Sequence, residues 1–267
     1  MTAARPNEKM PPLRPLRAAR GKAGGGRWVQ ALLGLLLVVP RAPALAQDTS
    51  ATMLRYRPTW WDAATVSASV VLYTLPDPLG LPRGSPSCAP CSAATLPWFD
   101  RWAVTTPATG PDVGSDVVLL GVAGWTALAG LLDAPRGDWA GNFAVYADAA
   151  SSTAAATEWL KVLVRRKRPI LYTDGALAAA GDPDNQQSFP SIHAGLAFAA
   201  ATSYLIVSGR EHLPHRTRNA ILLYAGAAAV SALRVASGQH FPSDVLAGAA
   251  LGSGIGWLVP TIHAKVP

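Results

Sequence analysis

Two histidines stand beside a hydroxyl and a carboxylate in two short stretches of the sequence. In FPSIHAG, Ser191 and His193 follow Pro190 and open an Ala-rich apolar segment. In LRVASGQHFPSD, His240 lies four residues before Asp244. A carboxylate that bonds one ring nitrogen of a histidine fixes its tautomer and leaves the other nitrogen free, which prepares a nucleophilic imidazole. We therefore expect Asp244 to orient His240.

Basic side chains accompany both histidines. In KVLVRRKRP, Lys161 and Arg168 are seven residues apart, nearly two helical turns, so both are expected on one helix face. Pro169 disfavours helix at the residue before it, so the helix should end at Arg168. Arg234 precedes His240 near the end of a later predicted helix. The helix that begins after Ser191 also attracts anions through its free N–H groups.

These side chains together suit chemistry on a phosphoryl group. Cations and helix N-termini stabilise negative charge on the equatorial phosphoryl oxygens. One histidine can attack phosphorus while the other protonates the leaving oxygen. Because the cations supply the positive charge, the expected reaction needs no metal ion and no other cofactor.

Each stretch taken alone has a simpler interpretation. Lys161 and Arg168 suit a cytoplasmic charge cluster or a solvated helix end. Ser191 suits a plain N-cap with an incidental His193, and Asp244 suits another helix cap. The agreement of the three stretches favours one shared site.

The elements that must position these residues are predicted to be helices. Strand-like alternation is nearly absent, and Ala, Leu and Val dominate segments that Pro and Gly interrupt. Six helices are predicted, at about 60–75, 115–132, 139–167, 191–208, 217–236 and 243–258. The predicted fold class is an all-α bundle of about six helices, embedded in a membrane.

Hydropathy supports the membrane and leaves a soluble bundle as the alternative. Half of the residues are hydrophobic and 15% are charged, against about 25% in typical domains. The 115–132 segment is long enough to cross a bilayer, whereas 139–167 must turn Asp148 and Glu158 towards a bundle interior.

The basic loop 209–218 predicts which membrane side each connection faces. It carries Arg210, Arg216 and Arg218, which is typical of a cytoplasmic loop. If the first helix lies flat on the membrane, segments 168–190 and 237–242 then meet on the outer side.

The first 46 residues carry the whole net charge of the protein. Residues 1–46 hold eight basic residues against Glu8 alone, which equals the total of +7 and removes the argument for a nucleic-acid partner. A basic start, an apolar core at 29–39 and Ala44-Leu45-Ala46 are typical of a cleaved secretory signal, with an uncleaved anchor as the alternative. The expected location is the bacterial cell envelope, either in the inner membrane with the site facing the periplasm or free in the periplasm.

The only cysteines, Cys88 and Cys91, form the motif CAPC. Outside the cytoplasm we expect a small-loop disulfide, with two free thiols as the alternative. The predicted organisation is a signal peptide at 1–46, an N-terminal helix and Pro/Gly-rich connection at 47–114, a catalytic helical domain at 115–260 and a tail at 261–267.

The three stretches together resemble the type 2 phosphatidic acid phosphatases (PAP2). That family shares its fold with bacterial non-specific acid phosphatases and vanadium haloperoxidases, and its pattern is K-x6-RP, then PSGH, then SR-x5-H-x3-D. The sequence reproduces the order and the internal spacings, from Lys161 and Arg168 through Ser191 and His193 to His240.

The resemblance implies a role for each matching residue. It implies that Lys161, Arg168 and Arg234 bind phosphate, with Ser191 and the backbone N–H of Ile192. It also implies that His240 is the nucleophile, that Asp244 orients it and that His193 is the general acid.

Two positions depart from the family pattern. Ile192 replaces a glycine, and Leu233 replaces a serine. Ile192 keeps its backbone N–H but places a bulky side chain at the site. Leu233 removes one polar partner.

The predicted function is hydrolysis of a phosphomonoester or diphosphate through a phosphohistidine, without metal. The expected substrate is a membrane lipid phosphate, such as phosphatidate, phosphatidylglycerol phosphate or polyprenyl diphosphate. The alternatives are a soluble acid phosphatase, a lipid phosphotransferase, a vanadium haloperoxidase and a membrane scaffold with weakened catalysis.

Overall fold

The computed structural model describes residues 56–263, and its regular structure within that range is entirely helical. The helices are α2 (Trp60–Thr74), α3 (Thr109–Asp133), α4 (Trp139–Val164), α5 (Ala176–Ala179), α6 (Ile192–Arg210), α7 (Arg216–Ala236) and α8 (Pro242–Ile262). Six long helices confirm the predicted all-α class, and α5 adds one short turn. The predicted signal peptide lies outside the described residues.

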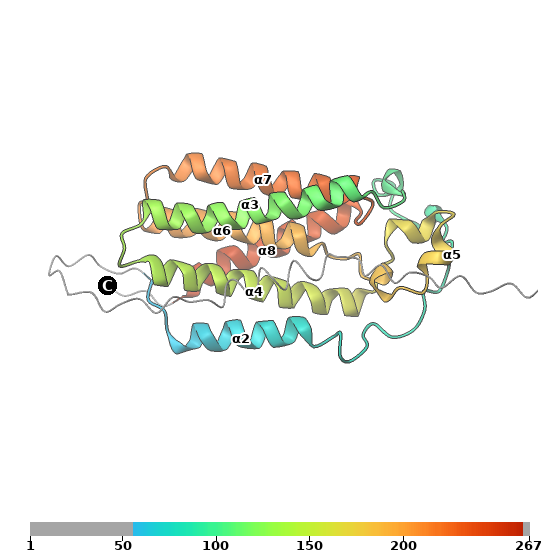
Figure 1. The fold of residues 1–267 in the computed structure, drawn as a ribbon, viewed down its shortest axis with the longest axis horizontal. Coiled ribbons are helices and arrows are strands. Elements are labelled where there is room, and N and C mark those ends of the chain that lie inside the picture. The colour runs from blue at the N-terminus through green and yellow to red at the C-terminus, as the bar shows by residue number, and fades with distance from the viewer. Residues whose placement is uncertain (1–55, 264–267) are drawn as a thin grey trace, which may run out of the picture.

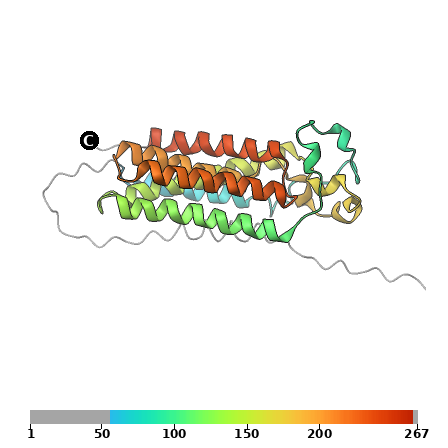
Figure 2. The ribbon, with the colours of Figure 1, turned by 90° about the horizontal axis from the view of Figure 1, so that it is seen from above.

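The long helices run side by side along one axis (Figure 1). The segments 75–108, 165–191 and 237–241 gather at the end where α5 lies, whereas 134–138 and 211–215 connect helices at the opposite end (Figures 1 and 2). The topology therefore brings 165–191 and 237–241 together, as expected from the sequence.

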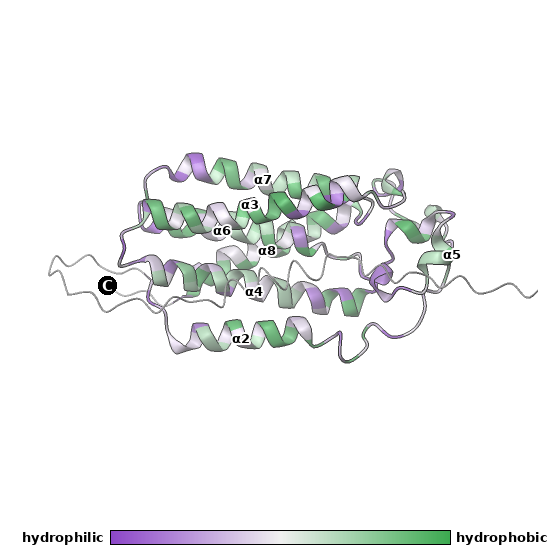
Figure 3. Cartoon of the chain, in the orientation of Figure 1, coloured by the Kyte–Doolittle hydropathy of each residue, from purple (hydrophilic) through white to green (hydrophobic). Residues whose placement is uncertain are grey.

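Four helices, α3, α6, α7 and α8, are long and apolar enough to cross a membrane. Apolar residues cover much of their length (Figure 3). Large apolar side chains such as Leu132, Ile221 and Leu246 stand exposed on α3, α7 and α8. The chain is therefore a membrane protein by the length and composition of these helices.

The polar helix α4 lies inside the bundle. Its polar side chains Asn142, Asp148, Thr153, Thr157 and Lys161 are buried. This confirms the expectation that its polar residues face the interior rather than lipid.

The first helix, α2, packs alongside the bundle and does not lie flat across its end, the arrangement assumed in the orientation argument above (Figure 1). α2 runs alongside α4 (Figure 1), and the Trp159 indole donates a hydrogen bond to the Leu72 carbonyl at 2.9 Å. Its 15 residues span about 22 Å, which is less than the hydrocarbon thickness of about 30 Å. α2 is thus a short lateral member of the bundle.

Helices α6 and α8 approach so closely that only glycine fits between them. A Cβ added at Gly252 would overlap the carbonyl of Gly195, and one at Gly248 would overlap the carbonyl of Ser191. Small residues four apart on a helix permit this backbone contact. The Ser191 N–H donates to the Asp244 carbonyl at 3.0 Å, so the beginnings of α6 and α8 are joined.

The end of α4 differs from the prediction. The helix ends at Val164 because Arg165 adopts a left-handed conformation with φ of 52°. Arg168 is extended instead, with ψ of 160°, and its N–H donates to the Asn185 carbonyl at 2.8 Å. The expectation that Lys161 and Arg168 share one helix face was therefore wrong.

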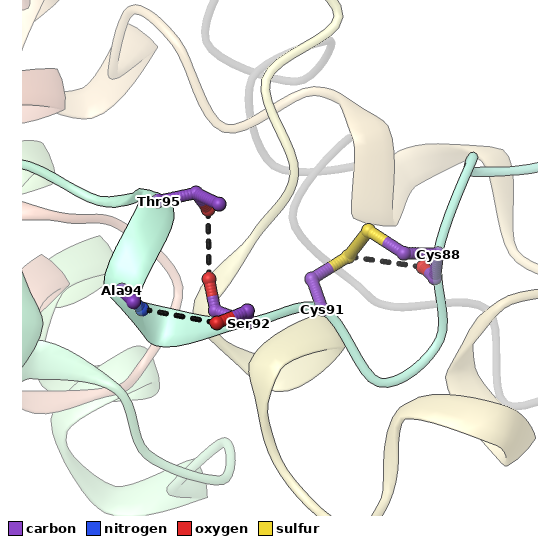
Figure 4. The surroundings of a disulfide bond; sticks show 5 residues. All are labelled: Cys88, Cys91, Ser92, Ala94 and Thr95. Carbon is purple, nitrogen blue, oxygen red and sulfur yellow. Dashed lines mark hydrogen bonds between the residues drawn. A yellow bond between two sulfur atoms is a disulfide. The ribbon is translucent and has the colours of Figure 1, made fainter.

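Cys88 and Cys91 form the predicted disulfide (Figure 4). The Cys91 N–H donates to the Leu171 carbonyl at 2.8 Å, which ties this small loop to segment 165–191. The alternative of two free thiols is thereby excluded.

Candidate active site

A cavity of about 270 Å³ opens where the segments 165–191 and 237–241 meet. Six of the predicted residues line it: Lys161, Arg168, Ile192, His193, Arg234 and His240. Ser191 and Asp244 are fully buried beside it rather than in its wall. The structure thus gathers residues from α4, α6, α7 and two connections around one space.

Each cation of the cavity is paired with a carboxylate that sequence reasoning missed. Lys161 Nζ lies 3.4 Å from Glu158 Oε2, and Arg168 Nη2 lies 3.3 Å from Asp184 Oδ2. Arg234 pairs with Asp112, which belongs to α3 because that helix begins at Thr109 rather than at 115.

The ion pairs favour the ionised form of a carboxyl group that lines the cavity. The guanidinium of Arg168 holds the pKa of Asp184, whose side chain is partly exposed, below its usual range. The three cations are therefore held in place by counterions that an anionic ligand can replace.

His240 is oriented by a backbone carbonyl. Its Nδ1 lies 2.7 Å from the carbonyl oxygen of Ser188. Since a carbonyl only accepts, Nδ1 carries the proton and Nε2 is left with its lone pair. Burial first, and then the charges of Arg234 and Arg168, hold the pKa of His240 well below its ordinary value. This environment therefore favours the neutral form of the His240 imidazole.

The predicted hydrogen bond between Asp244 and His240 is not formed. The closest carboxylate oxygen is 3.9 Å from His240 Nδ1. Instead, Asp244 Oδ2 accepts from the Phe241 N–H at 2.8 Å, because Asp244 lies in the first turn of α8, and from the Ser188 hydroxyl at 2.6 Å. Asp244 therefore contacts His240 indirectly: it binds the Ser188 hydroxyl, and the Ser188 carbonyl binds His240.

Arg166 completes this support and was not predicted as a site residue. It pairs with Asp244 and, at 2.7 Å, with Asp100, and it stacks 4.7 Å from the centre of the Phe241 ring. Asp100 also accepts from the Ser243 N–H and hydroxyl at 3.0 and 2.6 Å. The N-terminal connection therefore helps to fix the start of α8.

His193 has a carboxylate partner on another helix. Its Nε2 lies 2.8 Å from Asp116 Oδ1, and its side chain is 4% exposed. Asp116 belongs to α3, 77 residues earlier in the chain, so no local spacing indicated the pair. The contact requires Nε2 to carry a proton when Asp116 is ionised.

Ser191 occupies the N-cap position of α6, as predicted, but its hydroxyl makes no capping bond. Within residues 56–263, Ser191 Oγ is buried without a hydrogen-bond partner. The plain capping interpretation is therefore wrong for the side chain. A buried hydroxyl without a partner is able to donate to a ligand.

The two departures from the family pattern have different surroundings. Ile192 lines the cavity and also packs into the main hydrophobic core. Leu233 does not line the cavity, and its side chain lies near Gly114 of α3. Only Ile192 therefore changes the shape of the cavity.

Comparison with known families agrees with this geometry. Residues 143–267 match the PAP2 superfamily, and this stretch contains both histidines and all three cations of the cavity. The match covers just under half of the chain.

The curated relatives are phosphatases. The chain is 36% identical over 103 residues to the decaprenylphosphoryl-5-phosphoribose phosphatases of two strains of Mycobacterium tuberculosis. The matched stretch covers 39% of this chain and 51% of each relative, so the chain spans about half the length of these relatives. No solved structure matches the chain significantly.

Proposed function

We propose that this protein is a phosphatase that removes a terminal phosphate from a membrane lipid through a phosphohistidine at His240. The observation that carries the proposal is the placement of His240, with Nδ1 bonded to the Ser188 carbonyl, in one cavity with Lys161, Arg168 and Arg234. A neutral imidazole beside three cations suits attack on a phosphate ester.

The reaction has two displacement steps. Nε2 of His240 attacks phosphorus, and the bond from phosphorus to the ester oxygen breaks. His193, protonated on both ring nitrogens, gives its Nδ1 proton to that oxygen while Nε2 stays bonded to Asp116. Water then attacks the phosphohistidine, His193 takes a proton from the water, and the bond from phosphorus to Nε2 breaks. Inorganic phosphate leaves and His240 is restored.

The cations act on the phosphoryl oxygens in both steps. Phosphate entry replaces the contacts of Lys161 with Glu158 and of Arg168 with Asp184. The first N–H groups of α6, including that of Ile192, lack intrahelical acceptors and supply further donors. Together they stabilise the charge that develops in the transition state without a metal ion.

The cavity wall favours a headgroup that carries hydroxyls. Tyr73, Thr74 and Asp77 at the end of α2 line it together with Asp184 and Glu158. Hydroxyl and carboxylate oxygens accept hydrogen bonds from a sugar. Since the curated relatives act, by name, on a decaprenylphosphoryl sugar phosphate, we place a polyprenyl-phosphoryl pentose phosphate first. Phosphatidate, phosphatidylglycerol phosphate and polyprenyl diphosphate are the other candidates.

The proposed location is the bacterial inner membrane, with the cavity on the periplasmic side. The four apolar helices support the membrane. Arg136, Arg210, Arg216 and Arg218 all lie near the end opposite the cavity, and basic residues mark the cytoplasmic side.

The test is phosphate release by the full chain, purified in detergent and assayed in EDTA. The substrates are the polyprenyl-phosphoryl pentose phosphate, the three other lipids and a soluble aryl phosphate. We expect release that survives EDTA and falls at least about a thousandfold in His240→Ala. Labelled phosphate should remain on the wild-type protein after an alkaline quench.

His212→Ala is the matched control, because His212 is an exposed histidine away from the cavity. It should keep full activity. Folded protein that releases no phosphate from any substrate contradicts the proposal. Full activity in His240→Ala contradicts the mechanism alone.

A further inference from the structure

A cluster of three potential metal ligands lies towards the end of the bundle opposite the cavity. Asp62 is in the first turn of α2, Asp148 is in α4, and His263 follows the last residue of α8. α2 and α4 begin at that end and α8 finishes there (Figure 1). Three elements that are distant in sequence therefore converge.

The three side chains are close enough to share one ion. One ligand atom from each lies within 4.8 Å of the other two. Nδ1 of His263 is 3.3 Å from Asp62 Oδ1 and 4.0 Å from Asp148 Oδ2. Metal–ligand bonds of about 2.0–2.2 Å place ligand atoms roughly 3–4.4 Å apart, so small side-chain rotations complete the set.

The side chains of all three residues are almost removed from solvent. Asp62 and Asp148 are 8% and 5% exposed, and the His263 side chain is 6% exposed. Among the described residues, Asp148 Oδ1 has no hydrogen-bond partner. Buried carboxylates are unfavourable unless a cation or a donor compensates them.

The tautomer of His263 presents a lone pair to the carboxylates. Its Nε2 lies 3.3 Å from the Arg57 carbonyl, which can only accept, so Nε2 carries the proton. Nδ1 then faces Asp62 and Asp148 without one. Histidines that bind metals characteristically donate their other N–H to a carbonyl or carboxylate.

The capping role of Asp62 leaves one of its oxygens for the cluster. The Thr59 hydroxyl donates to Asp62 Oδ2 at 2.9 Å, while Oδ1 is the atom nearest His263. The cap therefore orients Asp62 towards the cluster. Three electron-pair donors, on Asp62, Asp148 and His263, meet in a buried space.

We propose that Asp62, Asp148 and His263 bind one divalent transition-metal ion, with Zn²⁺ as the first candidate and Mn²⁺ as the second. Two carboxylates balance the two positive charges, and an imidazole with two carboxylates suits either ion. The ion joins the beginning of α2 to the end of α8. It lies about the length of α2, roughly 22 Å, from the cavity, so its role is structural and separate from phosphate chemistry.

The test is metal binding by the full chain carrying a tag without histidines, after treatment with a chelator. ZnCl₂ and then MnCl₂ are titrated into the protein, and bound metal and Tm are measured. We expect about one bound equivalent and a rise in Tm of roughly 5 °C at saturating metal. Phosphate release, assayed below the Tm, should not change.

His263→Ala and Asp148→Asn should each abolish the binding and the rise in Tm. His215→Ala is the matched control and should retain both, because His215 pairs with Asp133 at 3.2 Å outside the cluster. If Asp148→Asn fails to fold, His263→Ala decides, since that residue lies beyond the last helix. His240→Ala should still bind about one equivalent of metal, which distinguishes this site from metal bound in the cavity.

Two results would overturn the proposal. One is a wild-type protein that binds neither ion, which leaves a protonated His263 to balance the carboxylates. The other is a folded His263→Ala variant that binds metal as tightly as the wild type.

Discussion

At the scale of single residues, the environment of His240 determines what the cavity can do. Buried imidazoles favour the neutral form, and nearby cations strengthen that preference. His240 has both, with Lys161, Arg168 and Arg234 around it. The cations proposed to bind phosphate therefore also favour the unprotonated form of the proposed nucleophile before the substrate arrives.

The pH dependence of kcat/KM follows from this environment. Attack requires neutral His240, so kcat/KM falls as pH drops through the pKa of His240 in the free enzyme. Because that pKa is lowered, we expect the acid limb below about pH 6.5, the ordinary histidine value. Initial rates on one lipid substrate, measured over a series of pH values, give the position of this acid limb.

Lys161→Met provides the control for this prediction. Lys161 is one of the cations that lower the pKa of His240, so its removal should move the acid limb to higher pH as well as reducing the rate. Ionisation of the substrate would give a limb that stays in place. An acid limb above about pH 6.5 in the wild type would contradict the prediction.

At the scale of elements, the close contact of α6 with α8 positions the two histidines. His193 lies in the first turn of α6, and His240 lies just before α8. Gly248, Gly252 and Gly256 allow the two backbones to touch. A wider spacing would move the proposed acid away from the proposed nucleophile.

Gly252→Ala tests this contact. Its Cβ would overlap the Gly195 carbonyl, and overpacking of this kind destabilises by about 1–3 kcal/mol. We expect a lower Tm and reduced phosphate release. Gly254→Ala, in the same helix, has open space around the added Cβ and should change stability by less than about 1 kcal/mol. Equal Tm values for the two variants would refute the argument.

At the scale of the whole molecule, the two ends of the bundle have different chemistry. The cavity, the disulfide and α5 lie at one end, whereas arginine-rich connections and the Asp62–Asp148–His263 cluster lie towards the other (Figure 1). Crossing a membrane would place these ends in different compartments. The proposed periplasmic reaction requires the cavity end to be outside.

Cysteine labelling in intact cells tests this orientation. The only native cysteines form a disulfide, so an introduced cysteine is the one free thiol. Ala178→Cys, exposed at the cavity end, should react with an impermeant maleimide. Arg136→Cys, exposed at the other end, should react only after the cells are opened. The reverse pattern would place the cavity in the cytoplasm.

Local patterns in the sequence were sufficient to predict the features that depend on near neighbours. Helix type and approximate ends followed from apolar segments, Pro and Gly. The Cys88–Cys91 disulfide followed from the CAPC motif in a chain expected outside the cytoplasm. Residue type and spacing were also enough to select Lys161, His193 and His240 as members of one site. These features depend on interactions within a few residues, which a linear pattern records.

The contacts between distant groups could not be predicted in this way, because they depend on how the helices pack. The pair of His193 with Asp116 joins residues 77 apart, and the pair of Arg234 with Asp112 joins residues 122 apart. His240 Nδ1 bonds the Ser188 carbonyl rather than the expected Asp244 carboxylate. This contact depends on how segment 165–191 folds over α8. Helix packing fixes such contacts, and no local spacing encodes which faces of two helices will touch.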